Sequence, residues 1–436
     1  MLFGECNDRS RGTKQREEPT GEARVQLPER FQVELRPSSL DELLPEDHRA
    51  RVIWTAVERL NLSSFYAAIQ ARGSSPGRPA IDPRILVALW LYATSEGVGS
   101  ARELERLCAA HDGYRWICGG VSVNHHTLSD FRVAHAAALD DLMTEVLTVL
   151  LHGGLVSLER VAQDGMRVRA SAGAASFRRQ RSLRKCLKAA REQVEQVKQH
   201  ADQPDPRRSA REQAAAQRSA REREERVARA MAELAKVRAA KKTPEAQKQA
   251  RASTTDPEAR VMKMSDGGFR PAFNVQLATD TKSRVIVGVR VTNAGTDMGQ
   301  VEPMLEEIER RTSQRPGELL VDGGFTKLES IQNADDHGVK VFAPVLRPRL
   351  ATIDPCRPKE GDPPGVAAWR ERMGTPQAKT IYKERAATAE TVNADLRSWR
   401  GLDRFNVRGT AKVLCVATWA ALTYNILRWA AAGGLT

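Results

Sequence analysis

Paired cysteines, aromatic side chains and long apolar runs are scarce in this 436-residue chain. Its six cysteines are scattered without a C-x-x-C pair, which argues against both a disulfide framework and a zinc site. A signal peptide is not expected, because residues 1–29 are polar and mixed in charge. The one long apolar run, 413–432, contains Asn425 and Arg428, and an arginine is rare within a membrane-spanning helix. We therefore expect this run to be a buried helix of a cytoplasmic protein without a membrane partner.

Basic residues, in contrast, are in excess. The chain has 68 lysines and arginines against 55 aspartates and glutamates, which gives a formal net charge of +13. A polyanion is therefore the expected partner, and nucleic acid is favoured over a membrane surface. The length suits two or three domains.

The N-terminal part divides into a tail and a helical region. Residues 1–38 have few apolar anchors and are predicted to be a disordered or extended tail. Over 39–152 apolar residues recur every three to four positions, which predicts an all-helical domain. Asp82, Ser100 and Thr127 stand where helices are predicted to begin, and the helix opened by Thr127 is expected to continue, with a bend, to Leu150. These helices suit a helix-turn-helix-like DNA-binding unit or an ordinary helical bundle.

The third predicted domain, 153–436, is interrupted by a segment of different composition at about 178–252. This segment consists mostly of Arg, Lys, Ala, Gln and Glu, and its few apolar residues step by threes and fours. Two prolines, Pro204 and Pro206, separate its halves, so the pattern predicts a basic helical hairpin, in part coiled-coil. Its cations suit contact with phosphates, and the alternative is a solvated, partly disordered linker.

Around that insertion, the chain alternates strands and helices. Strands are predicted at 160–164, 272–280, 284–291, 319–321 and 340–344, with helices at 298–311 and 327–336 and, after a loop at 347–376, at 378–398 and 412–431. This succession suits an α/β fold with a mixed five-strand sheet flanked by helices. With an acid on the first strand, an acid on the fourth and an acid on a later helix, it is the ribonuclease H-like layout.

Those three acids, Asp164, Asp322 and Glu390, form the candidate site. Each aspartate follows a short apolar run and precedes glycine, so both are predicted at the carboxyl ends of strands, where open α/β sheets place their active sites. The glycine after each aspartate leaves room for a phosphate backbone. Glu390 is expected to share a helix face with Lys383 and Arg397. The alternatives are ordinary Asp-Gly turns and a surface charge pattern on that helix.

Carboxylates without nearby histidine or cysteine suit hard divalent cations. Two such ions, about 3.5–4 Å apart, activate the nucleophile and stabilise the leaving alkoxide in phosphodiester cleavage. The composition and these acids therefore predict a metal-dependent enzyme acting on DNA.

Taken together, the motifs resemble the DDE-type transposases of bacterial insertion sequences. The similarity is to the superfamily around insertion sequences four and five, and especially to its eleven-eighty-two-like branch, and it covers most of the chain from about residue 40. The motifs that carry it are Asp82-Pro83-Arg84, Thr127-Leu128-Ser129-Asp130-Phe131-Arg132, Gln163-Asp164-Gly165, Phe273-Asn274-Val275-Gln276, Val321-Asp322-Gly323-Gly324-Phe325, Tyr382-x-x-Arg385…Glu390…Arg397 and Val407-Arg408-Gly409.

The resemblance implies that Asp164, Asp322 and Glu390 are a catalytic triad that binds two Mg2+ ions, for which Mn2+ can substitute, with Asp164 bridging both. It also implies that Tyr382 and Arg385, together with Arg397, contact DNA near the cleaved end. The surrounding cations Lys383, Arg404 and Arg408 are expected to bind DNA as well.

The implied function is that of a nucleoid-associated transposase. It would bind double-stranded DNA at the terminal inverted repeats of its element, cut the ends with water, and use the freed 3′-hydroxyl to attack target DNA. Two ends must be synapsed, so a homodimer is expected. The alternatives are a catalytically inactive DNA-binding protein derived from a transposase and a ribonuclease H-like, structure-specific nuclease.

The chain departs from the family pattern at three positions. Phe325 stands where tyrosine is usual, and Arg397 stands where lysine often occurs. The gap from Arg385 to Glu390 is one residue longer than in the common signature, so the third carboxylate departs most.

Overall fold

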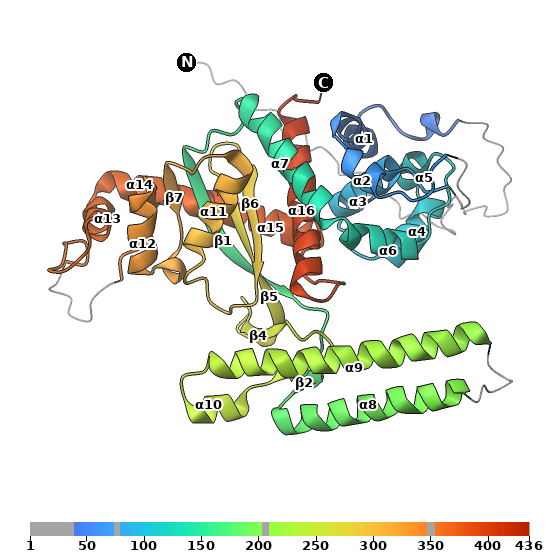
Figure 1. Ribbon diagram of the computed structural model, residues 1–436. Coiled ribbons are helices and arrows are strands. Elements are labelled where there is room, and N and C mark those ends of the chain that lie inside the picture. The colour runs from blue at the N-terminus through green and yellow to red at the C-terminus, as the bar shows by residue number, and fades with distance from the viewer. Residues whose placement is uncertain (1–38, 74–78, 203–208, 347–353, 436) are drawn as a thin grey trace, which may run out of the picture. The chain divides into compact units, whose positions relative to one another are not determined.

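A mixed β-sheet forms the core around which helices of residues 153–436 pack (Figure 1). The computed structural model describes residues 39–73, 79–202, 209–346 and 354–435. The tail predicted at 1–38 lies outside these ranges. The strands of the sheet are β1 (Arg160–Arg169), β4 (Arg260–Lys263), β5 (Phe269–Asp280), β6 (Ile286–Thr292), β7 (Glu318–Leu320) and β8 (Lys340–Phe342).

These six strands fill five positions across the sheet, in the order β6-β5-β1-β7-β8. β4 and β6 pair with successive stretches of the same edge of β5, since Ala272 pairs with Arg260 and Asn274 pairs with Thr292. β1 is antiparallel to β5 and parallel to β7, and β7 is parallel to β8. The predicted mixed five-strand sheet is therefore confirmed.

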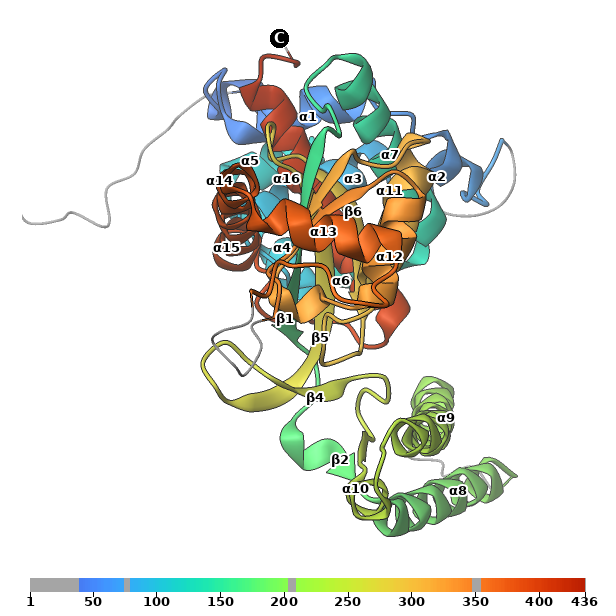
Figure 2. The ribbon, with the colours of Figure 1, turned by 90° about the vertical axis from the view of Figure 1, so that its left-hand side faces the viewer.

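Helices pack on both faces of the sheet (Figure 2). α11 (Val301–Thr312) lies against β6, where Gly288 permits its close approach, because a Cβ there would come within 2.6 Å of Met304 Sδ. The segment made of α14 (Pro376–Arg385), a π-helical turn (Ala386–Glu390) and α15 (Thr391–Ser398) contacts β1 instead. It meets Asp164, whereas Gln163 bonds to the carbonyl of Gln300 just before α11. Neighbouring residues of a strand point to opposite faces, so α11 and α14–α15 lie on opposite faces.

Two further helices flank β8: α12 (Leu328–Asp336) and α13 (Pro364–Gly374). The loop predicted for 347–376, of which 347–353 lie outside the described residues, is wrong for α13. Pro364 stands in its first turn, where proline is compatible with a helix. Trp369 is buried at 1% exposure, and its indole donates to the carbonyl of Ala343 at 3.2 Å. Tertiary packing therefore makes a helix from sequence rich in glycine and proline.

The N-terminal region is helical, as predicted. After a 3-10 turn (Asp41–Leu43) it forms α1 (Arg49–Arg59), α2 (Ser63–Ala67), α3 (Pro83–Ser95), α4 (Ala101–Ala110), α5 (Asp112–Cys118), α6 (His125–Ala134) and α7 (Ala136–His152). The caps predicted at Asp82 and Ser100 are confirmed. Thr127 is not a cap, because Asn124 accepts its backbone N–H at 2.9 Å. The bend expected before Leu150 lies at His135, where α6 ends and α7 begins. The predicted boundary between domains near 152 stays a prediction.

The last helix, α16 (Thr410–Ala431), connects the N-terminal helices to the sheet by packing on α3, α7 and β6. Within the described residues it is the one helix long and apolar enough to cross a membrane, and 67% of its apolar window is buried. Asn425 is fully buried and exchanges two hydrogen bonds, each 2.8 Å, with the backbone of Ile286. The expected buried helix is confirmed.

The basic insertion forms a helical hairpin, which we call the arm (residues 178–251). Its two long helices, α8 (Gln180–Asp202) and α9 (Ala210–Ala239), pack side by side (Figure 1), and α10 (Pro244–Gln249) follows. The strands β2 (Phe177–Arg178) and β3 (Ala252–Ser253) pair at its base. Leu183, Ala230 and Leu234 belong to a small apolar core of its own.

Candidate active site

Parallel pairing of β1 with β7 places Asp164 beside Asp322. Ala162 pairs with Leu320, and the two aspartates each lie two residues further along their segments. The backbone of Asp322 is extended, with φ −79° and ψ 174°, so continuing the register puts both carboxylates on one face of the sheet. The negative charge of Asp322 raises the pKa of Asp164, so the two carboxylates interact.

Asp164 lies within a strand and not at its end. The prediction of a strand ending there is wrong, because β1 continues for five more residues to Arg169. The carboxylate accepts hydrogen bonds from the backbone of Gly165 at 2.9 Å and from Nδ2 of Asn393 at 3.0 Å. Burial raises the pKa of Asp164 to about 6, although the Gly165 N–H and the charge of Arg385 act to lower it. Ionisation of Asp164 at neutral pH therefore lowers the stability of the folded chain.

Replacing Asp164 by Asn is expected to stabilise the metal-free protein at neutral pH. The folded-state pKa of about 6 lies above the ordinary 3.8. Between these values the folded state holds a proton that the unfolded state has lost, so stability falls as pH rises through this window. After allowance for one weakened hydrogen bond, we expect the free energy of unfolding at pH ~7.5 to rise by about 2 kcal/mol.

Urea denaturation with a chelator present measures this difference, and the gain should vanish near pH ~4. Asp336→Asn, at an exposed helix end, is the matched control with no expected change. If the parent were at least as stable as Asp164→Asn at neutral pH, the raised pKa of Asp164 in the folded protein would be contradicted.

The two glycines that follow the aspartates have different surroundings. At Gly165 a Cβ would lie 2.1 Å from Asp297 Oδ1, so the expected room for a phosphate is absent there. That space belongs to a buried network in which Asn274 and Gln276 each donate to Asp297 at 2.7 Å. At Gly323 a Cβ would meet nothing within 4 Å, so open space adjoins Asp322.

Glu390 is positioned by the π-helical turn. Such a turn contains one residue more than an α-turn, which accommodates the extra residue between Arg385 and Glu390. In a continuous α-helix positions five apart diverge by about 140°, yet Arg385 Nη2 lies 3.2 Å from Glu390 Oε1. The predicted face that grouped Lys383 with Glu390 assumed an unbroken α-helix and is wrong.

Arg385 connects the first acid to the third. Its Nη1 lies 3.8 Å from Asp164 Oδ2, and its side chain is only 14% exposed. The Glu390 side chain, in contrast, is 63% exposed. In the described part of the chain no three metal-ligating side chains are close enough to form a ready cation site. The fold thus brings Asp164 and Asp322 together, and the guanidinium of Arg385 links Glu390 to Asp164.

Two protein families match the chain, and both describe transposase domains. The first, "Transposase domain (DUF772)", matches residues 38–134, and the second, "Transposase DDE domain", matches residues 235–426. The chain belongs to the DDE transposases of insertion sequences. No curated protein and no solved structure matches it.

These matches confirm the family resemblance and do not bear on its eleven-eighty-two-like branch, which stays a prediction. Asp322 and Glu390 lie inside the second match, whereas Asp164 lies between the two. The arm is also outside both matches up to residue 234.

The residues predicted to bind DNA differ in their exposure in this transposase. Tyr382 is half-buried beside Arg385, and burial raises the pKa of its phenol. Lys383, Arg404 and Arg408 are exposed. Arg408 also donates to the carbonyl of Ser171 at 3.4 Å.

Arg397 lines a cleft of about 420 Å3 that also involves two cations missed at the sequence level, Arg167 and Lys263. Gly165, next to Asp164, lines it as well. Asn393 was missed too, although it lies three residues from Glu390 on the same helical segment. That spacing was visible in the sequence, whereas the approach of Lys263 depends on the pairing of β4.

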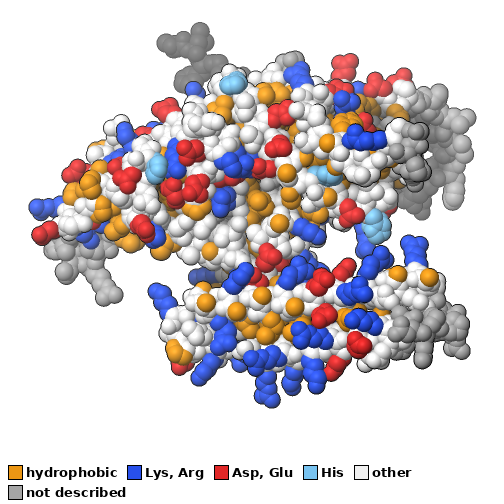
Figure 3. Space-filling view, in the orientation of Figure 1, with side chains coloured by type: hydrophobic (Ala, Val, Ile, Leu, Met, Phe, Trp, Pro, Cys, Tyr) orange, Lys and Arg blue, Asp and Glu red, His pale blue; other side chains and the backbone are white. Residues whose placement is uncertain are grey.

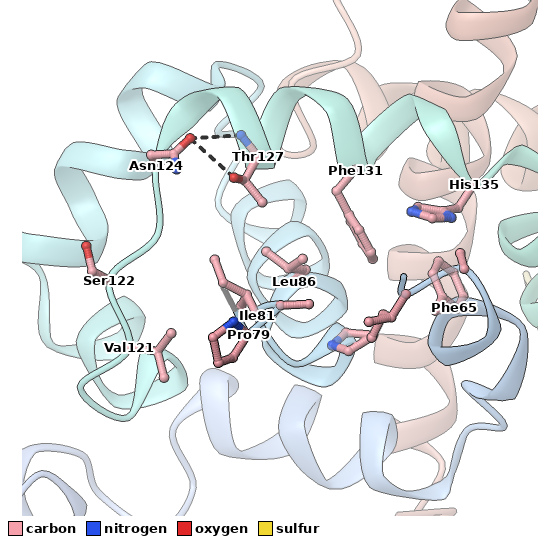
Figure 4. A pocket seen from close by; sticks show the side chains of 14 residues that line it. Phe65, Pro79, Ile81, Leu86, Val121, Ser122, Asn124, Thr127, Phe131 and His135 are labelled. Atoms are coloured by element: carbon pink, nitrogen blue, oxygen red, sulfur yellow. Dashed lines mark hydrogen bonds between the residues drawn. The ribbon is translucent and has the colours of Figure 1, made fainter. Parts of the chain in front are cut away.

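A second cavity, of about 720 Å3, lies among the N-terminal helices (Figure 4). Phe65, Ile81, Leu86 and Phe131 contribute to its apolar wall, and no aspartate or glutamate is among the described residues that line it. His135 is the one ionisable side chain among the described lining residues, and burial lowers the pKa of that histidine. This cavity therefore offers none of the acids that the proposed chemistry requires.

Proposed function

We propose that this transposase cleaves and joins DNA at the ends of its element, using divalent metal ions held by Asp164, Asp322 and Glu390. The observation that carries the proposal is the register of β1 and β7, which sets the two aspartates on one face of the sheet. Two carboxylates side by side repel each other, and a bound cation relieves that repulsion.

The strand order supports a ribonuclease H-like fold for the catalytic part. When β2 and β3 are set aside and β4 and β6, which share one position, are counted once, Asp164 lies on the first strand of the sheet and Asp322 follows the fourth, β7. Glu390 comes from a helical segment packed on the same face as Asp164. This is the arrangement that the family resemblance implies.

The donor set fits a hard cation. All three side chains offer carboxylate oxygens, the ligands that Mg2+ and Mn2+ prefer. The guanidinium between Asp164 and Glu390 indicates that this position favours positive charge. When bound, a pair of ions would activate the attacking oxygen and stabilise the leaving one.

The remaining residues of the site would position the acids and the DNA. Asn393 orients the Asp164 carboxylate through its hydrogen bond. Arg385, once freed from the acids, can donate two parallel hydrogen bonds to a phosphate. Lys263 and Arg397 line the cleft next to Gly165, and their charges suit the backbone of the strand being cut. Arg167 lines the cleft as well but is paired with Asp297 at 2.8 Å.

The other predicted contacts complete the DNA-binding surface. Tyr382 lies beside Arg385, and Lys383, Arg404 and Arg408 are solvent-exposed cations. The partner would be duplex DNA carrying the terminal inverted repeats and then target DNA. Synapsis of two ends would require two copies of the chain, so we propose a homodimer.

Cleavage of a duplex that carries the inverted repeats flanking the gene tests the proposal. With Mg2+ we expect strand cleavage at the repeat ends, and with a chelator we expect binding alone. Binding without cleavage in Mg2+ or Mn2+ would instead support a catalytically inactive DNA-binding protein. Cutting that follows DNA branching and ignores the repeats would support a structure-specific nuclease.

A further inference from the structure

The positive charge of the chain is concentrated in the arm. Residues 178–251 contain 22 of the 68 lysines and arginines and 10 of the 55 aspartates and glutamates. The rest of the chain therefore has 46 basic and 45 acidic residues and is almost neutral. Whatever long-range attraction the chain exerts on a polyanion thus originates mainly from these 74 residues.

Within the arm, one face of α8 carries much of this charge. Leu183, Ala190 and Val194 are buried, on the side of α8 that packs on α9. Positions 181, 185 and 188 point away from that stripe by helical spacing, and the exposed cations of this stretch are Arg181, Arg184, Lys185, Lys188 and Arg191. No acid occurs between 180 and 191. Figure 3 shows Lys and Arg side chains gathered over the arm.

These cations are not needed to hold the arm together. Within the described residues, Arg181, Arg184 and Lys185 form no ion pair. Lys188 has a 3.8 Å contact with Glu192, and Arg191, the last cation of the stretch, pairs with Glu224 of α9 at 3.3 Å. Such exposed pairs contribute little to stability. The buried acid of α9, Glu233, is instead paired with Lys236 and Arg260, and Arg260 lies at the start of β4. Arg181, Arg184, Lys185 and Lys188 on the outer face of α8 are therefore available to a ligand.

The spacing and composition favour the backbone of duplex DNA. Five cations occur over the eleven residues 181–191 of α8, about 15 Å of helix axis. Each strand of B-DNA carries about four phosphates over that length. The arm has no phenylalanine, tyrosine or tryptophan on which unpaired bases would stack, so single strands are disfavoured.

We propose that the outer face of α8 is a second DNA-binding surface, which holds duplex DNA through its phosphates and without sequence preference. The proposal rests on the proposed function only in taking DNA as the polyanion. The surface lies outside the candidate active site, so it requires neither the three acids nor a metal ion. It would increase the affinity of the transposase for any DNA near the site of reaction.

Binding of a random-sequence duplex, measured over a series of salt concentrations with a chelator present, tests this surface. The variant changes Arg181, Arg184, Lys185 and Lys188 to Gln. Each lost phosphate contact lowers the slope of log affinity against log salt by about 0.9, so we expect the slope to fall by about 3 to 4. The matched control changes Arg181 and Arg184 to Lys and Lys185 and Lys188 to Arg, and its slope should equal that of the parent.

A second variant makes α8 more positive by removing acids, whereas the first makes it less positive by removing cations. Changing Glu192 and Glu195 to Gln should tighten binding of the same duplex and steepen the slope, and circular dichroism checks that α8 stays helical in each variant. Slopes and affinities equal to the parent's in both variants would overturn the proposal. So would a change in sedimentation at unchanged DNA affinity, which would make the face a contact between copies of the chain. Because these measurements exclude metal, they are independent of whether the transposase cleaves DNA.

Discussion

Asp322→Asn is expected to lower magnesium-dependent cleavage at the element ends by about 10³-fold or more, a loss typical of removing one member of a catalytic set. Asparagine keeps the shape of the side chain and the oxygen that caps the turn, where Gly324 N–H donates at 2.8 Å. What it removes is the charge beside Asp164. A cation placed between the two would then lose one of its anionic ligands, while the fold and the DNA-binding cations stay in place.

The measurement is the single-turnover rate on an inverted-repeat duplex with Mg2+ in excess. Binding of the same duplex in the presence of a chelator should match that of the parent. Asp336→Asn is the matched control, because this acid lies at an exposed helix end outside the site. If Asp322→Asn cut DNA as fast as the parent, Asp322 would have no part in the chemistry.

The pairing of Asp164 with Asp322 is the part of the site that sequence patterns predicted best. Two short runs, each ending in Asp-Gly, indicated two strands of one sheet. The parallel register of β1 with β7 places their two aspartates next to each other. The pattern misplaced the end of β1, however. Gly165 resembles a turn residue, yet its small size serves the buried network around Asp297, which is formed by residues over a hundred positions away.

The position of the third acid, Glu390, could not be predicted for a different reason. Helix faces are predicted from a period of 3.6 residues, and a π-helical turn adds one residue to that period. The longer gap between Arg385 and Glu390 was visible in the sequence, but its absorption by the turn depends on packing, since Thr388 and Ala389 within it are buried. Packing also explains α13, because burial of Trp369 stabilises a helix in a segment whose sequence predicts a loop.

Arg385→Gln is expected to change metal affinity and cleavage in opposite directions. In the metal-free protein the guanidinium lies against Asp164 and Glu390, and its charge lowers the pKa of Asp164. A divalent cation that binds these acids must displace it and overcome its repulsion. Without it, we expect affinity for Mn2+ in the absence of DNA to rise by about tenfold, or about 1.4 kcal/mol. Cleavage at saturating metal should nevertheless fall by about 10²-fold, because a paired donor to the phosphate is lost.

Isothermal titration with Mn2+ and single-turnover cleavage measure the two effects separately, and Arg385→Lys is the matched control. Lysine keeps the charge, so its metal affinity should stay near that of the parent, while its single ammonium restores cleavage only in part. The opposite signs distinguish this role from a structural one, because a residue that merely holds the acids in place would weaken both metal binding and cleavage when removed. A Gln variant that binds Mn2+ less tightly than the parent would therefore show that Arg385 organises the acids and does not compete with the metal for them.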